Sequence, residues 1–132
     1  MARAWNTSWV PAQCPCSSGL PYDSCCGPFH RGQPAPTAER LMRSRYSAFA
    51  LRDTAYLLRT WHPSTRPPEL ELDPRVQWSG LRIVGRTGGS LLESTGTVEF
   101  SATYRVGGQR NSQDENSRFV KQGGQWFYLG PV

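Results

Sequence analysis

All four cysteines of this 132-residue sequence lie in one short stretch near its start. Cys14 and Cys16 form a C-x-C pair, and Cys25 and Cys26 follow as an adjacent pair after eight intervening residues. Four thiolates are the ligand number that a closed tetrahedral zinc site requires. The intervening Ser, Gly and Pro residues favour turns, which can bring both pairs to one ion. The spacing predicts a zinc site that folds with its metal, a coupling of roughly 10–16 kcal/mol in zinc peptides.

Three other uses of these thiols compete with zinc: structural disulfides, a redox pair and inert thiols. Disulfides are rare in the cytosol, and residues 1–13 lack the apolar core of a signal peptide. A bridge between adjacent Cys25 and Cys26 would be strained, and a redox pair usually has C-x-x-C spacing. His30, four residues after Cys26, is a further candidate that can replace or support a thiolate, although four cysteines already fill the shell.

The cysteine stretch also carries a family resemblance. Cys-Pro-Cys-Ser-Ser-Gly over residues 14–19, followed by Cys25-Cys26-Gly27, resembles the SEC-C motif, a short zinc-binding element also found in the preprotein translocase ATPase. The motif usually has Gly where this sequence has Ser17. Two further strings, Leu-Met-Arg-Ser-Arg-Tyr-Ser-Ala-Phe over 41–49 and Thr-Trp-His-Pro-Ser-Thr-Arg-Pro over 60–67, extend the resemblance to the YchJ family of bacterial proteins.

That resemblance spans nearly the whole sequence and implies its domain organisation. It implies a domain similar to nuclear transport factor 2, a cystatin-like α+β fold, behind a SEC-C-like zinc-binding element. We accordingly expect a leader over 1–12, the zinc element over 13–31 and the nuclear transport factor 2-like domain over 37–132. Some family members carry a second SEC-C motif after this domain, and we expect none in a sequence that ends at Val132.

Local patterns independently predict helices followed by strands. Thr37 and Asp53 are suitable N-caps for helices over 38–51 and 54–61, and Pro63 ends the second helix. Pairs of glycines at 88–89, 107–108 and 123–124 predict turns between strands. The expected strands cover residues 78–87 with a bulge at Gly80, 91–106, 110–121 and 125–129. Two helices before a four-stranded antiparallel meander make an α+β layout.

A curved sheet wrapped against helices leaves a cone in which a ligand can bind. The candidate pocket residues are Arg45, Tyr46, Trp61, His62, Trp78, Arg118 and Trp126. His62 has a pKa suited to acid–base chemistry, but at a helix end it can equally complement the helix dipole. Arg45, near the apolar helix face, needs a partner, either for a structural ion pair or for anion binding. Its candidate carboxylates are Asp53, Glu93, Glu99 and Glu115.

Composition limits the remaining function classes. No segment approaches the length of a membrane-spanning helix. The net charge of +5, carried almost wholly by arginine, permits contact with RNA or the ribosome. The cysteine usage and the absence of a targeting signal lead us to expect a cytoplasmic protein. A four-thiolate site has no open position at which to activate water, so we expect a module that binds a protein partner rather than an enzyme. The alternative is a small-molecule-binding protein or enzyme with its pocket near His62, and a homodimer is compatible with either function.

Overall fold

The structure, a computed structural model, describes residues 13–132, and the leader expected over 1–12 lies outside the described residues. The helical elements come first along the chain and the strands follow. The helical elements are η2 (Tyr22–Ser24), α1 (Gly27–His30), α2 (Ala38–Leu51) and α3 (Thr54–Arg59), and the strands are β1 (Gln77–Gly88), β2 (Thr95–Val106), β3 (Gln109–Gln122) and β4 (Gln125–Pro131).

Helix α2 begins and ends where its sequence predicts. The Thr37 side chain accepts a hydrogen bond from the Arg40 backbone N–H at 3.1 Å, which satisfies one of the free donors of the first turn. Glu39 lies in that turn, where a negative charge is favourable. The helix ends at Leu51, and Arg52 then adopts the left-handed conformation with φ of 61° and caps the last turn.

Helix α3 is shorter than expected because the residues after it join the sheet. Asp53 caps its start by accepting from the Tyr56 N–H at 3.0 Å. The helix ends at Arg59 rather than at Trp61. Tyr128 N–H donates to the Thr60 carbonyl at 2.9 Å, and His62 N–H donates to the Tyr128 carbonyl at 2.8 Å. These bonds pair the chain with β4 and take it out of the helix.

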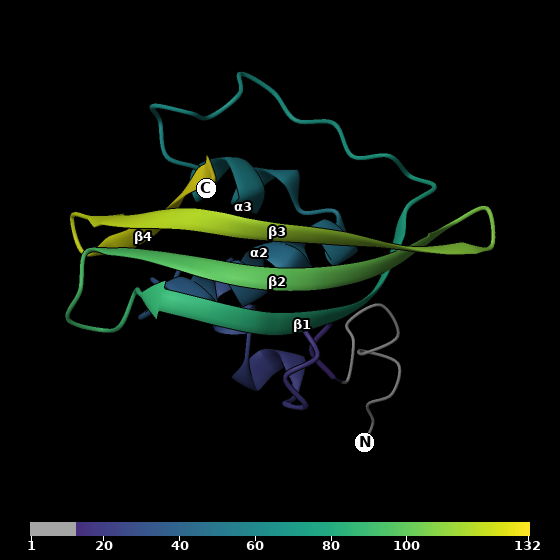
Figure 1. Ribbon diagram of the computed structural model, residues 1–132, viewed down its shortest axis with the longest axis horizontal. Coiled ribbons are helices and arrows are strands. Elements are labelled where there is room, and N and C mark those ends of the chain that lie inside the picture. The colour runs from purple at the N-terminus through teal and green to yellow at the C-terminus, as the bar shows by residue number, and fades with distance from the viewer. Residues whose placement is uncertain (1–12) are drawn as a thin grey trace.

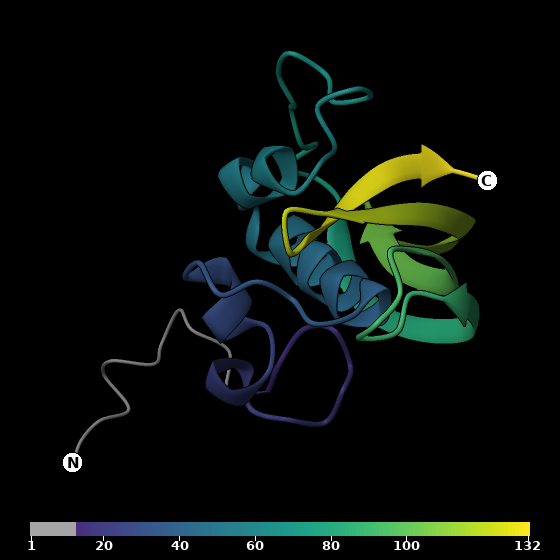
Figure 2. The ribbon, with the colours of Figure 1, turned by 90° about the vertical axis from the view of Figure 1, so that its left-hand side faces the viewer.

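The strands form one antiparallel sheet in the order β1-β2-β3-β4, which confirms the predicted meander. The register of β1 shifts between Trp78 and Gly80, as expected for a bulge at Gly80. Helices α2 and α3 lie on one face of the sheet (Figures 1 and 2). Along residues 13–132, no helix has both the length and the apolar character needed to cross a membrane.

The connection between β1 and β2 is longer than the predicted two-residue turn. Strand β2 starts at Thr95, not at Leu91. The Glu93 carboxylate accepts hydrogen bonds from the Ser90 backbone N–H and hydroxyl at 3.1 and 2.6 Å. This local turn removes the intervening residues from the ladder, and Leu92 is consequently 93% exposed.

The core lies between α2 and the covered face of the sheet. In β2 the buried side chains alternate along the strand, as its sequence pattern predicts for a half-buried strand. Phe119 from β3 and Trp126 from β4 complete this face. The buried α2 and β2 side chains are Leu41, Met42, Tyr46, Ala48, Val98, Phe100 and Ala102.

We expect Gly89→Ala to destabilise the fold by about 2–4 kcal/mol. Gly89 has a φ of 74°, and an added Cβ would lie 2.7 Å from the Ala38 Cβ. Its carbonyl also accepts the Ala38 N–H at 3.0 Å, which holds the start of α2 against the sheet. Gly107→Ala is the control, because Gly107 also has a positive φ but open space around it. Denaturant unfolding should find a cost of only about 1–2 kcal/mol there, and equal costs would contradict this account.

Candidate metal centre

The four cysteines come together in a buried cluster against α2. All four side chains are at most 5% exposed, and their sulfur atoms lie within 4.8 Å of one another. The loop between the two pairs folds back on itself. Cys14 N–H donates to the Leu20 carbonyl at 2.9 Å, and Cys25 N–H donates to the Tyr22 carbonyl at 3.0 Å. These bonds direct both cysteine pairs toward one point, as their spacing predicts.

The size of the cluster fits a single tetrahedral metal ion. Metal–sulfur bonds of ~2.3 Å place the four sulfurs ~3.8 Å apart. The Sγ atoms of Cys16 and Cys25 are 3.6 Å apart. All four cysteines are free, so no disulfide is formed among them. The donor set is thus complete, buried and of the right dimensions for a metal ion.

The clustered thiols shift one another's pKa values. Hydrogen bonds from Cys14 and Cys26 lower the pKa of the Cys16 thiol far below its usual range. The same contacts with Cys14 and Cys16 raise the pKa of the Cys26 thiol, and burial raises that of Cys25. Four sulfurs therefore compete for protons at one place. A bound dication would replace those protons and stabilise every thiolate at once.

A small polar residue of α2, Ser47, faces the cluster. The Ser47 hydroxyl lies 3.3 Å from the Cys26 sulfur and 3.4 Å from the Cys14 sulfur. Ser44 and Ser47 are both fully buried. The serine side of α2 is therefore buried as well as the side that packs on the sheet. The sequence signal for this second packed face of α2 was a pair of small residues, Ser44 and Ser47, spaced three apart so that they lie on the same side of the helix.

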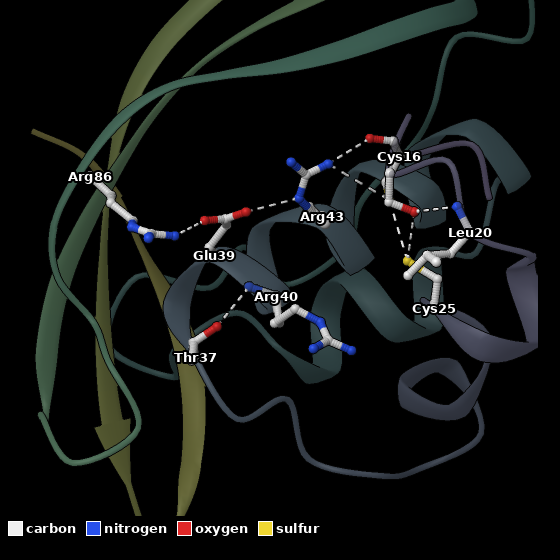
Figure 3. A network of polar contacts seen from close by, with 9 residues as sticks. Cys16, Leu20, Cys25, Thr37, Glu39, Arg40, Arg43 and Arg86 are labelled. Atoms are coloured by element: carbon white, nitrogen blue, oxygen red, sulfur yellow. Dashed lines mark hydrogen bonds and ion pairs between the residues drawn. The ribbon is translucent and has the colours of Figure 1, made fainter.

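Arginine contacts connect the cluster to the sheet (Figure 3). Arg43 donates to the Cys16 carbonyl at 2.9 Å and to the Glu39 carboxylate at 3.0 Å. Arg86 of β1 pairs with the same Glu39 carboxylate. Arg43 also lies 4.0 Å from the Cys16 sulfur, so its positive charge offsets part of the negative charge of a thiolate site. Sequence reasoning did not identify Arg43 as a neighbour of the cluster.

His30 lies next to the cluster but both of its ring nitrogens are used elsewhere. Nε2 is 2.8 Å from the Ser44 carbonyl, which can only accept, so Nε2 carries the proton. Nδ1 then accepts from the Tyr22 hydroxyl at 2.6 Å. His30 is therefore not a ligand of the cluster, and it instead ties α1 and η2 to α2.

Four of the seven candidate pocket residues line cavities between the helices and the sheet. Arg45, Tyr46, Trp61 and Trp78 line two adjacent cavities between the helices and the sheet, which share Met42, Phe49, Phe100 and Gln113. Arg45 forms no ion pair among the described residues. None of its candidate carboxylates, Asp53, Glu93, Glu99 or Glu115, lies within 4.0 Å. Its Nη1 atom donates to the Leu57 carbonyl at 2.8 Å and to the Thr60 hydroxyl at 2.7 Å.

The three other candidates lie apart from these cavities. His62 contacts the Ser64 hydroxyl at 2.7 Å and the Gln122 side-chain oxygen at 2.9 Å. Arg118 is exposed on β3. The Trp126 indole donates to the Pro36 carbonyl at 3.2 Å and lines a hollow beside Phe29 and Tyr56.

We expect His30 to be neutral at pH 7 with its proton on Nε2. Burial lowers its pKa below the ordinary value of 6.5. As pH falls through about 6.5, the unfolded chain binds a proton first, so the folded state loses stability until the lower folded pKa is reached. Imidazole NMR reads both the tautomer and the pKa. Tyr22→Phe should leave the tautomer unchanged, and a proton on Nδ1 would contradict the assignment.

Comparison with known proteins shows which family the chain belongs to. Residues 37–131 match the family model described as YchJ, middle NTF2-like domain. A UPF0225 protein of Streptomyces avermitilis is 57% identical over 122 residues, which cover 90% of this chain and 83% of the relative.

Two solved structures carry the same fold. The solution structure of a SEC-C motif containing protein from Rhodopseudomonas palustris is 38% identical, with a TM-score of 0.78 over 90% of this chain and 96% of its own. The crystal structure of a SEC-C motif containing protein from Psychrobacter arcticus is 32% identical, with a TM-score of 0.74 over 90% and 81%. The domain is thus nuclear transport factor 2-like, as its sequence resemblance implies, and the chain belongs to the YchJ family.

Proposed function

We propose that the cysteine cluster holds one Zn²⁺ ion through Cys14, Cys16, Cys25 and Cys26. The observation that carries this proposal is four buried sulfur atoms within 4.8 Å of one another. Thiolates select soft or borderline metals, and a tetrahedral S₄ set suits zinc. The Ser47 hydroxyl on α2 and the Ser18 hydroxyl on the intervening loop lie beside the sulfurs, as expected for the hydrogen-bonding shell of a metal site.

A zinc ion at this position would be structural rather than catalytic. Four protein ligands leave no open position for water or substrate. The ion would instead fix the loop between the cysteine pairs against α2. Cysteines used for a metal rather than for disulfides are typical of a reducing compartment, which supports a cytoplasmic protein.

The loop that zinc would fix is suited to contact a protein partner. Leu20 in this loop is 49% exposed, although its backbone is held by hydrogen bonds at both its N–H and its carbonyl. Ser17 also accepts the Leu81 N–H at 3.2 Å, which anchors the loop to β1. A rigid loop offers an apolar side chain with little loss of conformational entropy on binding. The proposed role is therefore an interaction module whose contact residue is Leu20.

Elemental analysis should find about one zinc per chain in the purified protein. Cys25→Ser should lose this zinc, because a hydroxyl is a much poorer zinc ligand than a thiolate. His30→Gln is the matched control and should keep one zinc per chain, since His30 is not a ligand. A protein without metal, or zinc loss in the His30 variant alone, would overturn the proposed site.

A photo-crosslinking amino acid at position 20 should form a discrete adduct with a cellular protein. Excess unlabelled wild-type protein should compete this adduct away, and Cys25→Ser in the same chain should abolish it. Position 92 is the control, because Leu92 is even more exposed but lies far along the chain in the β1–β2 connection. Equal adducts at both positions, or adducts with RNA alone, would reject the protein-binding role.

A further inference from the structure

A second site lies on the opposite side of α2 from the cysteines. A cavity of about 230 Å³ lies between α2 and the sheet. Its walls come from α2, from Trp61 in the segment that follows α3, and from strands β2, β3 and β4, so a rigid scaffold surrounds it on several sides. Its lining residues include Arg45, Trp61, Glu115, Ser117 and Tyr128.

The Arg45 side chain in this cavity is a buried cation with an unused edge. Arg45 is 3% exposed and lies near the aromatic rings of Trp61 and Tyr128, at 5.1 and 4.6 Å from their centres. Both of its hydrogen bonds among the described residues come from Nη1. The Nε and Nη2 donors remain, and together they form the edge of the guanidinium that binds a carboxylate through two parallel hydrogen bonds.

A neighbouring donor is also unused. The indole Nε1 of Trp61 is the buried side-chain polar atom that has no hydrogen-bond partner within residues 13–132. Leaving such a donor unpaired costs about 1–3 kcal/mol, so native structures seldom retain one without a reason. Trp61 lines the same cavity as Arg45. Less than 1 Å² of the indole nitrogen is accessible, so a bound acceptor would satisfy both side chains once the Trp61 ring turns its N–H toward the cavity.

The side chains of an adjoining cavity indicate what the rest of the ligand is like. A second cavity of about 140 Å³ adjoins the first and is lined mainly by apolar and aromatic side chains, including Tyr46, Phe49, Trp78 and Phe100. The Glu115 carboxylate is directed to Ser117 and Tyr128, which donate to its Oε2 atom at 2.6 and 2.8 Å. Glu115 therefore leaves the free edge of Arg45 to an external anion.

We propose that this cavity binds a small organic carboxylate, with its carboxylate on Arg45 and Trp61 and its apolar body in the adjoining aromatic cavity. Inorganic anions would satisfy the donors but leave the aromatic cavity unfilled. Neutral analogues would fill the aromatic cavity but leave the buried cation without a counter-charge. The combination of both features selects a carboxylate with an apolar body.

The test uses the metal-loaded full chain and NMR of the tryptophan indole N–H groups. Phenylacetate should shift the Trp61 indole signal in a saturable manner. The Trp126 indole signal should stay in place, because that group already donates to the Pro36 carbonyl away from the cavity. Phenylacetamide, acetate and inorganic phosphate are the matched probes, and each should bind at least about tenfold more weakly than phenylacetate.

Trp61→Phe keeps an aromatic ring beside Arg45 but removes the indole donor. Its affinity for phenylacetate, followed through the ligand signals, should fall by roughly tenfold or more. Trp126→Phe should change this affinity by less than about twofold. The proposal is overturned if phenylacetate at about 10 mM leaves the Trp61 signal unmoved, if phosphate or the amide binds as tightly, or if Trp61→Phe binds like the wild type.

Discussion

Helix α2 is buried on two opposite sides, and the contact between its serine side and the cysteine cluster joins the two parts of the chain. On one side Leu41 and Tyr46 pack toward the sheet. On the other, Ser47 contacts two cysteine sulfurs and the Ser44 carbonyl accepts from His30. Small hydroxyl side chains allow this close approach and supply hydrogen bonds to sulfur. The cysteine element is therefore a packed layer of the domain, and its order and that of α2 depend on each other.

The elements that local chemistry determines were predictable from the sequence. Side-chain caps at Thr37 and Asp53 set the starts of α2 and α3, and paired glycines set two of the hairpins. The clustering of the four cysteine sulfurs was equally predictable, because the number and spacing of the cysteines suffice to predict one shared site. What depends on distant contacts was not predictable. The burial of Ser44 requires knowledge that the cysteine element packs there, and the early end of α3 results from pairing with β4, more than sixty residues away.

Ser17 shows how a departure from a motif can be compensated. The SEC-C motif usually has Gly at this position, and here the backbone adopts a φ of 66°, where a side chain costs about 1–2 kcal/mol. The Ser17 hydroxyl accepts the Leu81 N–H, a contact that Gly cannot make and that contributes roughly 0.5–1.5 kcal/mol. The two effects are of similar size. This chain therefore tolerates strain in the cysteine loop in exchange for a direct link between that loop and β1.

On the sheet side of α2, the cost of burying the Arg45 charge must likewise be offset by other interactions. Burial lowers the pKa of its guanidinium to about 10, which still leaves the side chain charged at neutral pH. A carbonyl, a hydroxyl and two aromatic faces stabilise that charge, but no carboxylate among the described residues pairs with it. An apolar residue of similar size would fill the space without the cost of desolvation. The proposed carboxylate would give the open guanidinium edge of Arg45 the counter-charge that these neighbours do not provide, and this is why we infer that the cavity, more than His62, is the ligand site of the domain.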